Sequence, residues 1–161
     1  MIAILHNIRS LYNVGSIFRT ADAVGLEKIY LCGITPTPYD EFGQLRPQLA
    51  KVSLGAEKTV SWEKVKQTTR LIDVLKKSDF EIFVVEIAKN SIPYNEIEKI
   101  DPKKIALVFG HEVKGISPAI LKKADKILSI PMRGKKESLN VAVAFGIVAY
   151  HLSLPRITGF S

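Results

Sequence analysis

Short apolar runs that alternate with helical patterns constrain the fold of this chain more than any other feature. The expected strands cover residues 2–6, 28–32, 59–62, 81–86, 105–109 and 127–130. The expected helices cover residues 13–24, 46–52, 69–77, 117–124 and 139–152. Strands that alternate with helices form a mostly parallel sheet with helices on both faces. Because the chain has no internal repeat, linker or change in composition, we predict a single α/β domain over residues 1–161.

The last expected helix is apolar on every side, as its residues 141–150 read VAVAFGIVAY. A helix of this kind must be buried all round. A small domain rarely buries a terminal helix completely, so we predict a homodimer whose interface finishes the burial. A helix at the centre of the core is the alternative.

The chain carries a net charge of +7, which attracts polyanions such as nucleic acid. A soluble protein rich in lysine would explain the charge equally well. The basic residues are dispersed, so folding must bring any binding face together. The single cysteine, Cys32, cannot form an internal disulfide. With neither a secretory signal nor an apolar run long enough to span a membrane, the sequence predicts a cytoplasmic protein.

Three segments place polar residues at the ends of apolar elements. The first, residues 13–19 (NVGSIFR), puts Asn13 at the expected start of a helix, where it can cap free backbone N–H groups. Arg19 follows six residues later, nearly on the opposite side of that helix. A helix cap and a surface arginine would explain this segment without any function.

The second segment, residues 109–117 (FGHEVKGIS), connects a buried strand to a helix. Gly110 and Gly115 let the backbone turn sharply and approach a ligand. The segment lacks the second histidine of a HExxH zinc motif, and Ile116 stands where a P-loop requires lysine. We therefore predict no metal site. A plain turn is the alternative, but Glu112 beside so apolar a strand needs a partner or solvent.

The third segment comprises residues 130–134 (IPMRG) and 137–142 (ESLNVA), again between a strand and a helix. Ser138 and Asn140 are good capping residues, and a cap alone would explain them. However, these two polar residues introduce an otherwise apolar helix. Polar groups at a buried helix start need something to bind, so the segment also favours a ligand site.

Taken together, the three segments resemble the SpoU–TrmH branch of the SPOUT methyltransferase superfamily. They match its Asn-x-Gly-x-x-x-Arg, Phe-Gly-x-Glu-x-x-Gly-x-Ser and Ile-Pro-Met…Ser-Leu-Asn-Val-x-Val-Ala elements, in order. The resemblance spans residues 2–152. It implies an α/β fold whose C-terminal segment passes through a trefoil knot, and a catalytic site at a dimer interface.

The resemblance also implies transfer of a methyl group from S-adenosylmethionine to a ribose 2'-hydroxyl of RNA, without a metal. The residues implied to hold the cofactor are Val85, Glu86, Gly110, Ile130, Met132, Ser138 and Leu139. Backbone contacts by several of these suit an adenine ring in a mostly apolar slot. Only RNA carries the 2'-hydroxyl, so RNA is the implied substrate.

Arg19 is the implied catalytic residue, with Asn13, Glu112 and Asn140 orienting it and the ribose. A literal arginine base is difficult because the pKa of arginine exceeds about 12. An RNA phosphate can instead help to take the proton, or Arg19 can position phosphate and stabilise a developing alkoxide. The cations beside the third segment that could grip phosphate are Arg133, Lys135 and Lys136.

The length of the chain favours transfer RNA over ribosomal RNA, because compact family members acting on the wobble position are similar in length. Two alternatives stay open at this stage. One is a non-catalytic RNA-binding or assembly protein with the same fold. The other is a relative that methylates bases, although such relatives lack an element like the one that contains Arg19.

Overall fold

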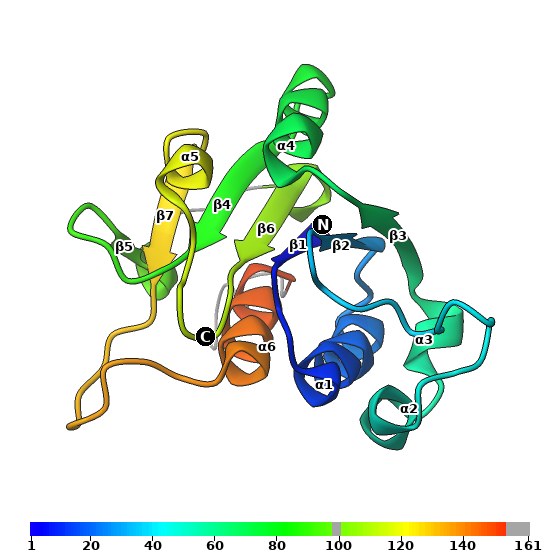
Figure 1. Ribbon diagram of the computed structural model, residues 1–161. Helices are drawn as coiled ribbons and strands as arrows, with labels where there is room; N and C mark the ends of the chain where they lie inside the picture. Colours follow the sequence, from blue (N-terminus) through cyan, green and yellow to red (C-terminus); the bar gives the residue numbers. More distant parts are fainter. Residues whose placement is uncertain (98–100, 154–161) are drawn as a thin grey trace, which may run out of the picture.

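Seven parallel strands form one sheet in the computed structural model, which describes residues 1–97 and 101–153 (Figure 1). The strands are β1 (Ile2–His6), β2 (Lys28–Cys32), β3 (Ser61–Val65), β4 (Glu81–Val85), β5 (Ile92–Pro93), β6 (Ile105–Phe109) and β7 (Lys126–Ser129). Their order in the sheet is β3-β2-β1-β6-β4-β7-β5. The predicted parallel sheet is therefore confirmed.

Strand β6 lies at the centre of the sheet, and all five of its residues are buried. It pairs with β1 on one side, where Ile4 is opposite Val108, and with β4 on the other, where Phe83 is opposite Leu107. Side chains of successive strand residues point to opposite faces. An apolar run such as IALVF therefore builds a core on each face of the sheet.

Helices cover both faces of the sheet, as predicted (Figure 1). They are α1 (Leu11–Ala23), α2 (Pro47–Ser53), α3 (Ala56–Thr59), α4 (Thr68–Lys77), α5 (Pro118–Leu121) and α6 (Val141–Ser153). Short 3-10 helices cover Tyr94–Glu96 (η1) and Pro102–Lys104 (η2). Helices α1 and α6 pack together on one face, where the rings of Phe109 and Phe145 lie 5.3 Å apart. Helices α4 and α5 bring Ile72 and Ile120 to the core of the other face.

The start of α1 differs from the prediction. The helix begins at Leu11, and Ser10 is its cap, because the Ser10 hydroxyl accepts a hydrogen bond from the backbone N–H of Asn13. The expectation that Asn13 caps this helix is therefore wrong. Since Asn13 lies inside the first turn, its side chain is free to bind elsewhere.

Other boundaries move by a few residues. The strand expected at 59–62 begins at Ser61, because residues 56–59 form the unpredicted helix α3. The helix expected at 117–124 ends at Leu121. The last helix begins at Val141, since Asn140 takes the cap position and its side chain accepts from the backbone N–H of Ala142.

The path of the C-terminal segment as a trefoil knot stays a prediction, as does the extent of the domain over residues 1–161. Its last residues, 154–161, lie outside the described part of the chain. Within residues 1–97 and 101–153, each helix is too short or too polar to cross a lipid bilayer. The cytoplasmic location also stays a prediction.

Candidate functional site

A cavity of about 280 Å³ lies beyond the carboxyl ends of β4, β6 and β7. Open parallel sheets bind ligands at this edge, where the connections leave the strands. The walls come from the ends of these strands, from the turn after β6 and from the start of α6. The lining includes all seven predicted cofactor residues, Val85, Glu86, Gly110, Ile130, Met132, Ser138 and Leu139. Their role in binding stays a prediction.

The turn after β6 is held against the end of β4 by Glu86. One carboxylate oxygen of Glu86 accepts from the backbone N–H of Ile116 at 2.9 Å, and the other accepts from that of Ile87 at 2.9 Å. Gly115 has a φ of +64°, and a Cβ there would lie 2.5 Å from Glu86 Oε2. A Cβ on Gly110 would lie 2.9 Å from the carbonyl oxygen of Gly115. Both glycines are therefore required for the turn to close.

His111 sits inside the same turn and lines the cavity. Its Nδ1 accepts hydrogen bonds from the backbone N–H groups of Val113, at 3.0 Å, and Lys114, at 3.2 Å. Because Nδ1 is an acceptor, the ring proton is on Nε2. His111 therefore offers an N–H donor to any ligand beside the turn.

Glu112 joins the turn to the start of α1. Its carboxylate accepts from the backbone N–H groups of Arg9 and Ser10 and from the side-chain amide of Asn13, each at 3.2 Å. Burial alone would raise the pKa of Glu112, but hydrogen bonds from its own backbone, Arg9, Ser10 and Asn13 outweigh this and lower it. Glu112 is therefore an anion at neutral pH. Its hydrogen-bond partners meet the need for a partner that was predicted from the apolar strand before it.

Asn13 connects the first segment to the third. Its side-chain oxygen accepts from the amide of Asn140 at 3.0 Å, across 127 residues of sequence. The oxygen of Asn140 accepts in turn from the backbone N–H of Ala142 at 2.9 Å, which caps α6. We call Glu112, Asn13 and Asn140 the three-residue network. It brings together one residue from each of the three predicted segments.

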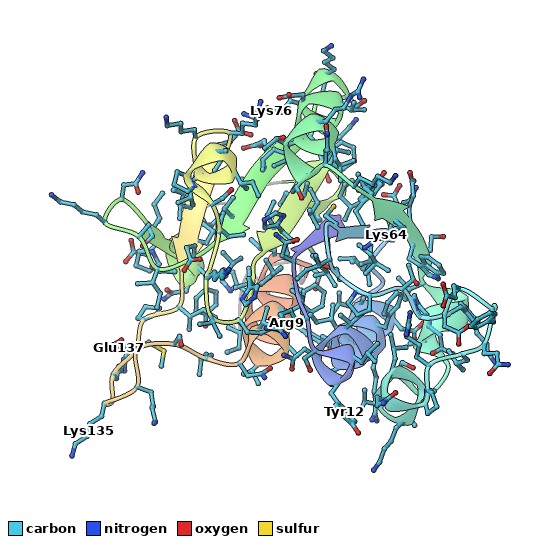
Figure 2. The ribbon with its side chains drawn as sticks, viewed as in Figure 1. Arg9, Tyr12, Lys64, Lys76, Lys135 and Glu137 are labelled. Atoms are coloured by element: carbon cyan, nitrogen blue, oxygen red, sulfur yellow. The ribbon has the colours of Figure 1, made fainter. Side chains whose placement is uncertain are left out.

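Arg19 does not reach this cavity within one chain. It is exposed on α1 and is not among the cavity-lining residues. Its side chain has no hydrogen bond or ion pair with the other described residues. The other cations predicted to grip RNA, Arg133, Lys135 and Lys136, are exposed on the loop before α6, from which Lys135 extends away from the sheet (Figure 2).

Sequence reasoning missed several residues of the cavity wall, namely Ile87, His111, Val113, Leu128, Ser129, Val141 and Ala144. Their positions in the sequence could have indicated them, because most of them flank the end of a strand or the start of α6. Cys32 lies in the core, where burial raises the pKa of its thiol to about 11. It is therefore no candidate nucleophile.

The chain matches the model of the SpoU rRNA Methylase family over residues 1–150. It is 33% identical over 156 residues to a tRNA (guanosine(18)-2'-O)-methyltransferase of Aquifex aeolicus (strain VF5), covering 97% of this chain and 70% of that protein. An AdoMet-bound rRNA methyltransferase from Sinorhizobium meliloti superposes with a TM-score of 0.84 and 26% identity, covering 94% of this chain and 54% of that one.

A second structure, which concerns the 2-OH methylation of C/U34 on tRNA, has a TM-score of 0.76 and 25% identity. The match covers 94% of this chain and 92% of that one. Other relatives are longer, and the chain spans 59% of the length of TrmH family proteins from Staphylococcus aureus. Since the family model covers nearly the whole chain and the three segments converge at one edge of the sheet, the protein belongs to the SpoU methylase family.

Proposed function

We propose that this protein transfers the methyl group of S-adenosylmethionine to a ribose 2'-hydroxyl of RNA. The three-residue network carries the proposal, because it joins three distant polar segments beside one cavity. The three segments that the sequence singled out thus meet at one place, joined by hydrogen bonds across 99 and 127 residues. The activity of the Aquifex relative and the AdoMet bound to the Sinorhizobium structure support the same function.

The residues around the cavity fit S-adenosylmethionine. The volume of about 280 Å³ is close to the lower end of the range for ligand pockets, about 300–1,000 Å³. Apolar walls such as Val85, Ile130 and Leu139 suit an adenine ring, while Glu86 and Glu112 place carboxylates at a site for a cation. When bound, the cofactor supplies a methyl group already activated by a positively charged sulfur. The protein then has only to position the ribose and manage its proton.

Arg19 is the proposed catalytic residue, and a second subunit would bring it to the reacting atoms. Val143 and Tyr150 of α6 are 51% and 42% exposed, as is Tyr12 of α1 at 49%. Figure 2 shows Tyr12 pointing outward from α1. Apolar side chains exposed on two neighbouring helices favour a protein partner. We therefore propose a homodimer through α6, in which α1 of one subunit completes the site of the other.

Transfer RNA is the proposed substrate. The Aquifex relative acts on tRNA, and this chain matches 92% of the structure that concerns position 34 of tRNA. The net charge of +7 suits a polyanion. Ribosomal RNA is the competing substrate, since the Sinorhizobium relative is an rRNA methyltransferase.

The test is methyl transfer from labelled S-adenosylmethionine to total RNA of a strain lacking this protein. The tRNA and rRNA fractions are separated and digested to nucleosides. We expect the label in 2'-O-methylated nucleosides of the tRNA fraction. Label in rRNA would show that the substrate is ribosomal RNA, and a methylated base would show a different reaction. If no RNA is labelled, the proposal that this protein is a methyltransferase is wrong.

Arg19→Ala tests the catalytic proposal. Removing a group that stabilises a developing oxyanion lowers the turnover number by about 100- to 1,000-fold. The Kd for S-adenosylmethionine, measured by calorimetry, should not change. Arg70→Ala is the matched control, because Arg70 is an exposed arginine of α4 on the other face of the sheet. Normal turnover by Arg19→Ala would remove Arg19 from the mechanism.

A further inference from the structure

A second cavity, of about 390 Å³, borders the cofactor cavity. Its lining consists of Asn7, Arg9, Ile34, His111, Val113 and Lys114. His111 and Val113 line both cavities, so the turn after β6 is a shared wall. We propose that the second cavity seats a nucleotide of the RNA next to the methylated ribose. This inference rests on the proposed function, and it names where the RNA chain is held.

The floor of the second cavity is rigid. Asn7 has a φ of +57°, and its side-chain oxygen accepts from the backbone N–H of Ile34 at 3.0 Å. Its amide is 3.0 Å from Nε2 of His6. A side chain at Gly33 would collide with the Asn7 oxygen, so only glycine fits there. A left-handed asparagine and an obligatory glycine are backbone costs that a simple connection would not require. They fix Ile34 at the rim.

The second cavity also has two cations whose side chains make no ion pair with the described residues. Arg9 and Lys114 are exposed and, among the described residues, their side chains have no ion pair. Four other surface lysines are each paired with a carboxylate, namely Lys28, Lys76, Lys123 and Lys126. The carboxylate of Glu112 lies nearby, but its oxygens accept from two backbone N–H groups and from Asn13, and not from either cationic side chain. Two free cations at one cavity suit the phosphates on either side of a nucleotide.

The backbone connects one of these cations to the reaction site. The backbone N–H of Arg9 donates to Glu112, so the Arg9 side chain begins directly beside the three-residue network. Figure 2 shows Arg9 on the segment between β1 and α1. A phosphate held by Arg9 would therefore place the adjoining ribose close to the cofactor cavity.

The walls suit a planar base. Ile34 is 62% exposed and Val113 is 89% exposed, and they face one cavity. Apolar side chains packed against the face of a base bury apolar surface, and this contribution does not depend on salt. The Nε2–H of His111 provides one hydrogen-bond donor for a base edge or a sugar. Cations, apolar walls and one donor together match a nucleotide better than a lipid or a peptide.

The experiment compares Arg9→Ala, Lys114→Ala and the double variant with the wild type. Both changes leave the backbone N–H groups in place. The probe is tRNA from a strain lacking this protein, and its Kd is measured by filter binding over a range of salt concentrations. Calorimetry gives the Kd for S-adenosylmethionine. Lys77→Ala is the control, because Lys77 lies at the end of α4, next to Lys76 and at the opposite edge of the sheet (Figure 2).

Each removed phosphate contact should weaken tRNA binding by roughly tenfold and reduce the slope of log K against log salt by about 1. The KM for tRNA should rise more than kcat falls, while the Kd for S-adenosylmethionine stays constant. Val113→Ala should weaken tRNA binding several-fold without changing the salt slope, because it removes apolar contact surface and no charge. The control should behave as wild type.

Wild-type tRNA affinity and salt slope in the double variant would overturn the inference, even if the wild type methylates RNA and the proposed function stands. A loss of S-adenosylmethionine affinity in the double variant would also overturn it, by assigning these side chains to the cofactor cavity. If the wild type transfers no methyl group, the proposed function fails. A weaker, less salt-dependent complex in the double variant would still support the nucleotide site.

Discussion

Helices α1 and α6 have the same length, 13 residues, and pack together on one face of the sheet, but they differ in how completely the chain buries them. The apolar side of α1, with Val14, Ile17 and Phe18, is buried, and polar residues face outward. Helix α6 is apolar on all sides, yet Val143 and Tyr150 remain exposed. The core of one chain therefore buries the apolar side of α1 and leaves only its Tyr12 exposed among large apolar side chains, whereas α6 presents two such side chains that suit a second subunit.

The two helices begin at the same place. Ser10 caps α1 and Asn140 caps α6, and the Asn13–Asn140 hydrogen bond links their first turns. The first turns of both helices thus lie at the candidate site, while the rest of each helix contributes to the core and to the proposed interface. Mutations can separate these roles, and the largest expected effects come from the core.

Phe18→Ala and Phe145→Ala should each lower the free energy of unfolding by about 3–5 kcal/mol, because both side chains are fully buried. Urea unfolding of each variant measures the loss. Similar losses of unfolding free energy in the two variants would show that α1 and α6 contribute equally to the core. A loss below about 1 kcal/mol at either position would contradict the packing described here.

Val143→Glu should weaken the proposed dimer at least about 100-fold, since a symmetric contact would place a charge opposite an apolar surface or its own copy. Sedimentation velocity over a range of concentrations reports the change. Val74→Glu introduces the same charge at an exposed valine of α4 and should leave the dimer intact. If the wild type sediments as a monomer at all concentrations, the proposed homodimer through α6 is wrong.

Ser10→Ala and Asn140→Ala should each cost about 1 kcal/mol, as the loss of a helix cap does. The two variants should differ in function. Asn140→Ala also removes the hydrogen bond to Asn13 and a wall of the cofactor cavity, so it should weaken binding of S-adenosylmethionine, while Ser10→Ala should not. Thermal unfolding and calorimetry on the same samples test both statements, and equal cofactor affinities would contradict the network.

Glu112→Gln should have the smallest effect on stability, because the carboxylate is exposed. The pKa of Glu112 is lowered in the folded protein from its ordinary value of 4.5. A lowered pKa means that the carboxylate stabilises the fold above pH 4.5 and loses this contribution as the pH falls through the folded-state value. The difference in Tm between wild type and variant should shrink on acidification. A difference in Tm that grows on acidification would show that the pKa of Glu112 is raised by folding and not lowered.

Much of the fold could be predicted from local pattern, and the exceptions have physical causes. Strand β6 was predicted at its observed bounds, because five apolar residues lie between polar segments. Strand β5 was missed since two residues, one a proline, show no periodicity at a sheet edge. The cap of α1 was assigned to Asn13 rather than Ser10, because both residue types cap helices well and pattern alone does not choose between them.

The site was less accessible to local reasoning. The need of Glu112 for a partner could be predicted from the apolar strand before it, but its partners are the backbone groups of Arg9 and Ser10, 103 and 102 residues away. The cofactor residues came from the resemblance to a family, and not from periodicity. The second cavity was missed entirely, because Arg9 and Lys114 are ordinary surface residues until the sheet brings β1 and β6 together.

The central position of β6 has a consequence for a chain that is synthesised from its N-terminus. Before residues 105–109 leave the ribosome, β1, β2 and β3 can pair with one another, but β4 has neither β6 nor β7 beside it. The cavity proposed to hold S-adenosylmethionine needs still later residues, up to Ala144. A partly made chain therefore cannot hold the methyl donor, and any stabilisation by that ligand is reserved for the finished protein.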